Sequence, residues 1–96
     1  MKIKRIEHVA IAVKDLEGSK KMLTDLFGLS LEYEEQINAT RLAMFPVGES
    51  YLELLQSDDA TSKTAQWIES KGQGLFHICL EVDDIVQALS ELKSKG

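Results

Sequence analysis

The sequence predicts an α+β fold made of two paired βαβββ modules, the second of them incomplete. Residues 6–16, IEHVAIAVKDL, match residues 75–85, LFHICLEVDDI, at an offset of 69 positions, so that His8 falls on His77. Alternate residues in both segments are apolar, which is typical of a β-strand with one buried face. Similarity at a fixed offset indicates that one structural unit occurs twice.

The first copy opens with this strand and continues with a helix. Asp15 is a suitable N-cap, and apolar residues recur at helical spacing until Gly28 ends the helix. The inward positions expected on this helix are Leu16, Ser19, Leu23, Leu26 and Phe27. Three short runs follow, LSLEYEEQ, TRLAMFPV and SYLELLQ, and the turn residues between them predict three strands.

A connecting segment then leads into the second copy. It contains a predicted helix at residues 61–70, and the side chains expected to face inward are Ala65, Trp67 and Ile68. After its strand, the second copy continues with a helix that Asp84 would cap. The apolar stripe expected on that helix consists of Ile85, Ala88, Leu89 and Leu92.

The repeat also defines the domain organisation. Residues 1–57 form the expected first module, residues 58–74 the connecting helix, and residues 75–96 the strand and helix that begin the second module. By the repeat, about 35–45 further residues carrying three strands would follow, so we expect the sequence to be incomplete.

Composition excludes several classes of function. The net charge is −5, which disfavours nucleic-acid binding, because that binding relies on a basic face. One cysteine cannot form an internal disulfide, which fits a reducing compartment. The apolar run near the N-terminus is too short for a signal peptide or a membrane span. We expect a cytoplasmic protein that does not bind a membrane.

The two histidines of the chain, His8 and His77, are the first candidate site residues. Each lies on the strand face opposite the apolar stripe. A lone histidine there is more often structural, but related modules packed about a pseudo-two-fold axis would bring both rings to one central site. Neutral imidazole is the commonest protein ligand for zinc-like metals. The repeat therefore favours a metal site.

Glu53 is the third candidate ligand. In the run YLELL, alternation places Leu52 and Leu54 on one face and Glu53 on the other. A carboxylate inside an apolar strand is costly to bury unless it is paired or coordinated. The alternative is an edge strand with Glu53 in water. The repeat counterpart of Glu53 would lie near position 122, and together these ligands would leave open positions for substrate oxygens.

At these residues the chain resembles the vicinal-oxygen-chelate superfamily, which includes glyoxalase I, extradiol dioxygenases and methylmalonyl-CoA epimerases. The likeness runs from Ile6 to Gly96 and rests on the ordered motifs HVAIAV, FPVGESYLELLQ and GLFHICLEVDD. It is strongest toward the methylmalonyl-CoA epimerases. The resemblance implies a single glyoxalase-like domain with His8, Glu53 and His77 as metal ligands. The family's last glutamate, a ligand and proposed base, would fall beyond residue 96, so no catalytic base is assigned.

The implied function is that of an isomerase that removes a proton next to a thioester carbonyl. A divalent metal (cobalt, manganese, zinc or nickel) would stabilise the enolate while a general base takes the proton. The implied substrate is an acyl-CoA or another thioester. Some epimerases carry a further glutamate on the third strand, where this chain has Arg41. If Arg41 faced the cleft, it would bind a substrate carboxylate; otherwise it is a solvated arginine.

Two alternatives remain open. The first is a glyoxalase-I-type lactoylglutathione lyase, which uses similar ligands on a glutathione-bearing substrate. The second is a metal-free protein that binds a small ligand, as antibiotic-resistance members of the superfamily do. An open sheet edge invites pairing with another chain, so we expect a homodimer. Without further strands, the chain is expected to bind metal weakly and to turn over little substrate.

Overall fold

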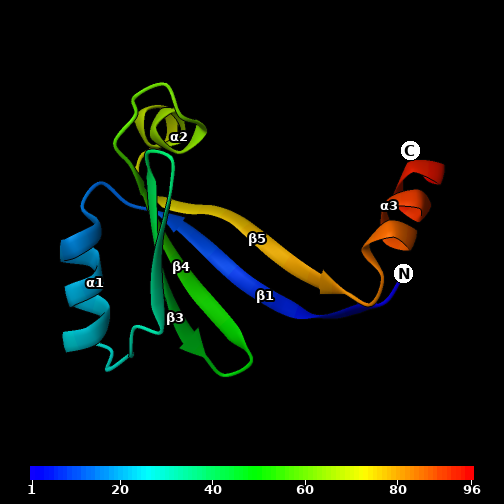
Figure 1. Cartoon of the computed structure of the whole chain (residues 1–96), viewed down its shortest axis with the longest axis horizontal. Coiled ribbons are helices and arrows are strands. Elements are labelled where there is room, and N and C mark those ends of the chain that lie inside the picture. Colours follow the sequence, from blue (N-terminus) through cyan, green and yellow to red (C-terminus); the bar gives the residue numbers. More distant parts are fainter.

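The computed structural model describes all 96 residues as a five-stranded mixed sheet with three helices (Figure 1). The elements in chain order are β1 (Ile3–Ala12), α1 (Leu16–Asp25), β2 (Tyr33–Ile37), β3 (Thr40–Val47), β4 (Ser50–Ser57), α2 (Lys63–Lys71), β5 (Gly74–Val82) and α3 (Ile85–Ser94). The sheet order is β2-β3-β4-β1-β5. The predicted α+β class is confirmed. None of the three helices has the length and apolar character needed to cross a lipid bilayer.

Strand β1 joins the two parts of the sheet. It runs parallel to β4 and antiparallel to β5. Strands β2, β3 and β4 pair antiparallel through short turns. Helix α1, β2 and β3 together form the connection between the parallel strands β1 and β4. Figure 1 shows β1 and β5 extending together away from β4 toward α3.

Side-chain caps fix where the helices begin. Asp15 accepts a hydrogen bond from the Gly18 N–H at 3.1 Å, and Asp84 accepts one from the Gln87 N–H at the same distance. These two acids occupy equivalent positions in the repeat, and both were predicted as N-caps. Ser62 caps α2 through the Ala65 N–H, so this helix begins slightly later than the sequence predicts.

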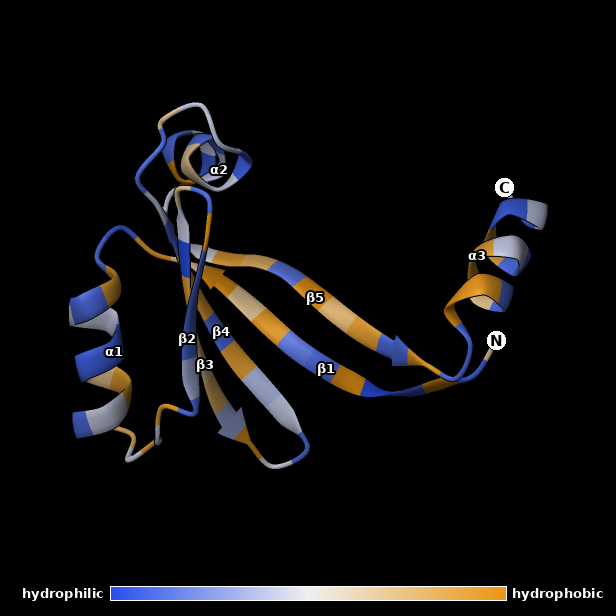
Figure 2. Ribbon diagram, in the orientation of Figure 1, coloured by the Kyte–Doolittle hydropathy of each residue, from blue (hydrophilic) through white to orange (hydrophobic).

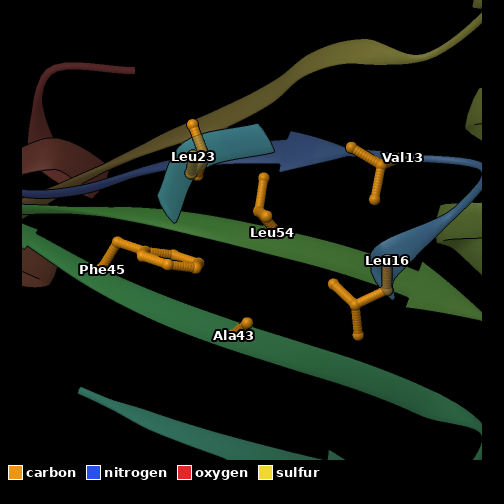
Figure 3. Close-up of a cluster of buried hydrophobic side chains, with 6 residues drawn as sticks. All are labelled: Val13, Leu16, Leu23, Ala43, Phe45 and Leu54. Carbon is orange, nitrogen blue, oxygen red and sulfur yellow. The ribbon is translucent and has the colours of Figure 1, made fainter. Parts of the chain in front are cut away.

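The main hydrophobic core lies between α1 and one face of the sheet (Figure 3). Its buried members are Val13, Leu16, Leu23, Ala43, Phe45 and Leu54. Leu26 and Phe27, predicted to face inward, are instead 76% and 66% exposed. Helix α1 ends at Asp25, so the helical spacing that would bury these two side chains does not reach them.

A smaller cluster covers the opposite face of the sheet. It consists of Ala10, Leu42, Met44 and Leu55, with Tyr51 and Phe76 packed against it. Residues of β1, β3 and β4 therefore alternate between two apolar layers. This second face carries the candidate site.

The apolar side chains of helix α3 are mostly exposed, contrary to expectation. Ala88 is buried, but Ile85, Leu89 and Leu92 are all more than half exposed. Its counterpart α1 packs against β3 and β4, whereas the strand before α3, β5, stands at the edge of the sheet. Figure 2 shows the apolar first turn of α3 lying away from the main sheet. The stripe exists in the sequence, but no sheet face lies opposite it.

Candidate metal centre

The pairing of β1 with β5 has internal two-fold symmetry. Val9 pairs with Ile78, and these two residues are equivalent in the 69-residue repeat. The flanking pairs are His8 with Cys79 and Ala10 with His77. Exchanging each residue for its repeat equivalent converts one flanking pair into the other. A local two-fold axis therefore passes between Val9 and Ile78 and relates the two histidines.

Two β-bulges obey the same symmetry. The register between the strands shifts between Ile6 and His8, which leaves Glu7 unpaired, and between Ala10 and Ile11, which leaves Phe76 unpaired. Glu7 and Phe76 are repeat equivalents, and each directly precedes a histidine. A bulge bends its strand and re-aims side chains. Phe76 and His77 accordingly both line one cleft, although strict alternation would place them on opposite faces.

The imidazoles and a carboxylate converge on the cleft side of the sheet. The Nε2 atoms of His8 and His77 are 3.2 Å apart, and His8 Nε2 lies 3.7 Å from Glu53 Oε1. One ligand atom from each of the three residues lies within 4.8 Å of the others. Metal–nitrogen and metal–oxygen bonds of about 2.0–2.2 Å place neighbouring ligand atoms roughly 3–3.5 Å apart. Small side-chain movements would therefore let all three bind one ion.

Glu53 is held at the centre of the sheet. It pairs with Met44 on one side and with Ala10 on the other, and Ala10 in turn pairs with His77. Strand β4 lies inside the sheet, so the alternative of an edge-strand glutamate in water is wrong.

Burial and charge act in opposite directions on this carboxyl. Glu53 is only 8% exposed, and burial raises the pKa of its carboxyl group. The charges of protonated His8 and His77 would lower that pKa. A buried carboxylate is costly unless a positive charge lies beside it, and the nearest groups that can carry one are two imidazoles. A bound cation would compensate the charge of Glu53. The donor set therefore fits a divalent metal.

Glu7 orients the first imidazole. Its Oε2 contacts His8 Nδ1, which directs Nε2 toward His77 and Glu53. Carboxylates beside ligating histidines commonly fix the ring tautomer in this way. Glu7, His8 and Cys79 also form a three-donor cluster. Because Glu7 already engages His8 Nδ1, we favour the set on the Nε2 side.

The three donors lie in a cleft of about 580 Å³. Its walls come from the β2–β3 turn, from the start of α2 and from the sheet. Leu55 lines this cleft, whereas Phe45 is fully buried beneath α1. Sequence reasoning did not single out Thr64, which also lines the cleft, because a threonine in a short polar helix carries no distinguishing pattern.

Two tyrosines also face the cleft side of the sheet. Tyr33 pairs with Met44, and Tyr51 packs against the apolar cluster on this face. The Tyr51 hydroxyl donates to Glu32 at 2.7 Å, which raises the pKa of Tyr51. Burial raises the pKa of Tyr33, as do nearby carboxylates that include Glu53. Neither phenol is ionised at neutral pH, and the one O–H of Tyr51 is already used by Glu32.

Arg41 does not line this cleft, so of its two expected positions the cleft-facing one is not found. Leu42 and Met44 belong to the apolar cluster on the cleft side of the sheet, so the neighbouring Arg41 points to the other side of β3. Its Nη2 donates to Gln56 Oε1 at 3.1 Å, and its Nη1 lies 3.9 Å from Glu17 Oε1. The arginine therefore belongs to a polar cluster at the start of α1 rather than to the candidate metal centre.

Comparison with known proteins identifies the class. Residues 7–96 match the model of the Glyoxalase/Bleomycin resistance protein/Dioxygenase superfamily. The chain belongs to this superfamily. A methylmalonyl-CoA epimerase of Mus musculus is 30% identical over 97 aligned positions, covering 98% of this chain and 54% of that protein. YqjC of Bacillus subtilis, whose function is uncharacterized, is 32% identical and is covered to 66% by the alignment, which takes in 91% of this chain.

Solved structures give the same result for the fold. A methylmalonyl-CoA epimerase variant of Streptomyces coelicolor, in complex with 2-nitronate-propionyl-CoA, has a TM-score of 0.93 at 27% identity, covering 99% of this chain and 72% of that one. The epimerase of Mycobacterium tuberculosis has a TM-score of 0.92 at 26% identity, covering 98% and 65%. The chain spans about half to two thirds of the length of the curated relatives above.

Proposed function

We propose that this chain acts as a metal-dependent isomerase that removes a proton from the carbon next to a thioester carbonyl, with methylmalonyl-CoA as the model substrate. The convergence of His8, His77 and Glu53 on one face of a cleft carries the proposal. The likeness to methylmalonyl-CoA epimerases supports the substrate class.

In this proposal His8, Glu53 and His77 hold the metal and do not transfer protons, because a metal-bound imidazole is a poor base. A divalent cation at this position would act as a Lewis acid toward the oxygens on which charge develops. Leu42 and Leu55 form the apolar floor beside Glu53 and exclude water from the reacting carbon. Exclusion of water strengthens every electrostatic contact in the cleft.

Metal analysis tests the proposed cofactor. Protein purified from zinc- or cobalt-supplemented medium is expected to carry metal, and a H77A variant is expected to carry much less. A metal content below about 0.1 per chain would instead support a metal-free binding protein, since the imidazole–carboxylate set would then have no ion to hold.

Hydrogen–deuterium exchange at the substrate carbon tests the reaction. Metal-loaded protein in D₂O is expected to exchange the proton of methylmalonyl-CoA faster than either the metal-free protein or the H77A variant. The exchange is followed by NMR. Exchange on the hemithioacetal of methylglyoxal and glutathione, with none on methylmalonyl-CoA, would support a glyoxalase-I-type enzyme instead.

We also propose that the chain forms a homodimer through the edge of β5. Ile78 and Leu80 are about half exposed along this edge, and the backbone there is unpaired on its outer side. Such an edge pairs readily with another strand. Light scattering after size exclusion is expected to give twice the chain mass for the wild type and the chain mass for I78K. A monomeric wild type at high concentration would rule this out.

A further inference from the structure

The two imidazoles of the candidate metal centre are held in different ways. Glu7 contacts Nδ1 of His8 and fixes that ring. His77 has no such carboxylate, and the hydrogen-bond contact that its ring makes within the protein is the one between its Nε2 and Nε2 of His8. His77 is also exposed, whereas His8 is partly buried. Hydrogen bonding to the protein therefore does not explain how the ring of His77 is oriented.

Ring contacts provide the missing support. The rings of Phe76 and His77 have centroids 5.2 Å apart and are tilted by 48°. Phe76 also contacts Trp67 of α2 edge-to-face, with centroids 5.6 Å apart and an angle of 62° between the planes. Aromatic rings at such separations prefer edge-to-face and offset arrangements. A continuous series of ring contacts therefore runs from α2 through Phe76 and His77 to His8.

Phe76 is held in place by two sets of contacts. Its ring packs against the apolar cluster on the cleft face of the sheet, which consists of Ala10, Leu42, Met44 and Leu55. Its other support is Trp67, in a helix that contacts β1, β4 and β5. Figure 1 shows α2 beside the start of β5. Closely packed side chains are restricted to few rotamers. The ring of Phe76 is therefore a fixed surface beside the imidazole of His77.

The repeat gives this arrangement a counterpart. Phe76 is the repeat equivalent of Glu7, and each residue stands at a β-bulge directly before a histidine. In the first copy the bulge residue holds the following imidazole by a polar contact. In the second copy the bulge residue places an aromatic ring against the following imidazole. The same backbone irregularity thus brings a supporting side chain to each histidine, with different chemistry.

We propose that Phe76, supported by Trp67, is a positioning residue that orients His77 for metal binding, as Glu7 does for His8. The inference rests on the proposed function for the metal itself. Phe76 acts through His77, because a ligand that is already oriented loses less side-chain freedom when it binds an ion. The packing of α2 against β5 is thereby coupled to the affinity of the metal centre.

Zinc affinity, measured by competition with a chromophoric chelator, tests this role. F76L keeps an apolar side chain but removes the ring, and it should weaken zinc binding about tenfold, at the lower end of what outer-shell changes cost. Cobalt-loaded F76L should also show a changed visible spectrum, because the geometry around the ion changes. F76Y keeps the ring and should match the wild type in both measurements.

The matched control for a loss of packing is L23A. It removes apolar volume from the main core, on the face of the sheet opposite the candidate metal centre. L23A should lower the unfolding temperature without changing zinc affinity or the cobalt spectrum, which are measured where every variant is folded. An F76L variant with wild-type zinc affinity and cobalt spectrum would overturn the proposal. A loss of zinc affinity in L23A equal to that in F76L would overturn it as well.

A double-mutant cycle tests the part played by Trp67. W67L should weaken zinc binding in the wild-type background, because Phe76 loses its support from α2. In the F76L background the same change should have no further effect, since the two residues act as a unit. Equal effects of W67L in both backgrounds would refute the support of Phe76 by Trp67.

Metal-free protein provides a measurement that does not depend on the cofactor. The rings of the chain's two histidines lie 5.3 Å apart, so nuclear Overhauser effects between their protons report the orientation of His77. These signals should persist in F76Y and L23A and weaken in F76L. A wild type that binds no zinc but shows this NMR pattern would refute the proposed function and leave the positioning of His77 by Phe76 standing. Unchanged signals in F76L would overturn the positioning role.

Discussion

The Nε2 atoms of His8 and His77 face each other at 3.2 Å although the residues are 69 positions apart. At this separation both rings cannot be protonated without strong repulsion. Either one nitrogen donates its proton to the other, or both direct lone pairs at a shared cation. Glu53, 3.7 Å from His8, adds a negative charge that favours the cation.

The first prediction concerns the ligands. H77A should lower zinc affinity more than 100-fold, because losing a direct ligand costs more than the roughly 10–100-fold typical of outer-shell changes. Competition with a chromophoric chelator measures this. The matched control is C79A, which removes a thiol two residues after His77 and should stay within a few fold of the wild type. A large loss in C79A alone would favour the cluster of Glu7, His8 and Cys79.

The second prediction concerns pH and Glu53 in metal-free protein. Burial raises the pKa of this carboxyl in the folded state above its unfolded value, so the folded state holds the proton more tightly. The stability from this group is present below the unfolded pKa and is lost as pH rises through the folded pKa. E53Q should therefore stabilise metal-free protein at pH 7, by about 1–3 kcal/mol, and much less near pH 4.

Urea unfolding at the two pH values measures this difference. Adding zinc should reverse the order at pH 7, because the charged carboxylate of the wild type gains more binding energy from the cation than the neutral amide of E53Q does. An E53Q variant that is less stable than the metal-free wild type at pH 7 would show that Glu53 is satisfied without a metal.

The third prediction compares the two helix caps. D15A should lower the free energy of unfolding by about 1 kcal/mol, since α1 covers the main core and Asp15 holds its first turn. D84A removes the equivalent cap from α3, in which Ala88 is the one buried residue. We expect D84A to increase amide exchange within α3 while barely changing global stability. Equal global losses in the two variants would mean that α3 is cooperatively packed.

The fourth prediction concerns Arg41. R41M should leave the affinity for methylmalonyl-CoA within about twofold of the wild type, because the guanidinium lies on the side of β3 away from the cleft. Surface ion pairs such as that with Glu17 contribute little, so stability should change by less than about 1 kcal/mol. A tenfold loss of affinity, measured by calorimetry, would show that Arg41 contributes to substrate binding.

The sequence predicts that His8, Glu53 and His77 come together, because two simple patterns locate these side chains. The repeat relates His8 to His77, and alternation in the run around Glu53 gives the face of that side chain correctly. Arg41 could not be placed in the same way. Leu42, Ala43, Met44 and Phe45 are all buried, so β3 is apolar on both faces and alternation there carries no information. The bulges at Glu7 and Phe76 have no pattern of their own in the sequence.

The packing partners of the helices could not be predicted from the sequence either. The apolar stripe on α3 indicates that Leu89 and Leu92 are suited to burial. A pattern within one helix does not predict whether a sheet lies opposite that helix. For the same reason the spacing that includes Leu26 and Phe27 could not reveal that α1 ends one turn earlier. Local periodicity describes what an element can bury, and tertiary structure decides what it does bury.

The antiparallel pairing of β1 with β5 also sets the order of events as the chain folds. It joins strands separated by more than 60 residues, so the entropy of closing that long loop must be overcome before the two imidazoles meet. The β2–β4 hairpins need no such closure and can form first. Uptake of zinc during refolding would then follow the last slow step, and a zinc-sensitive dye would time the completion of the native state.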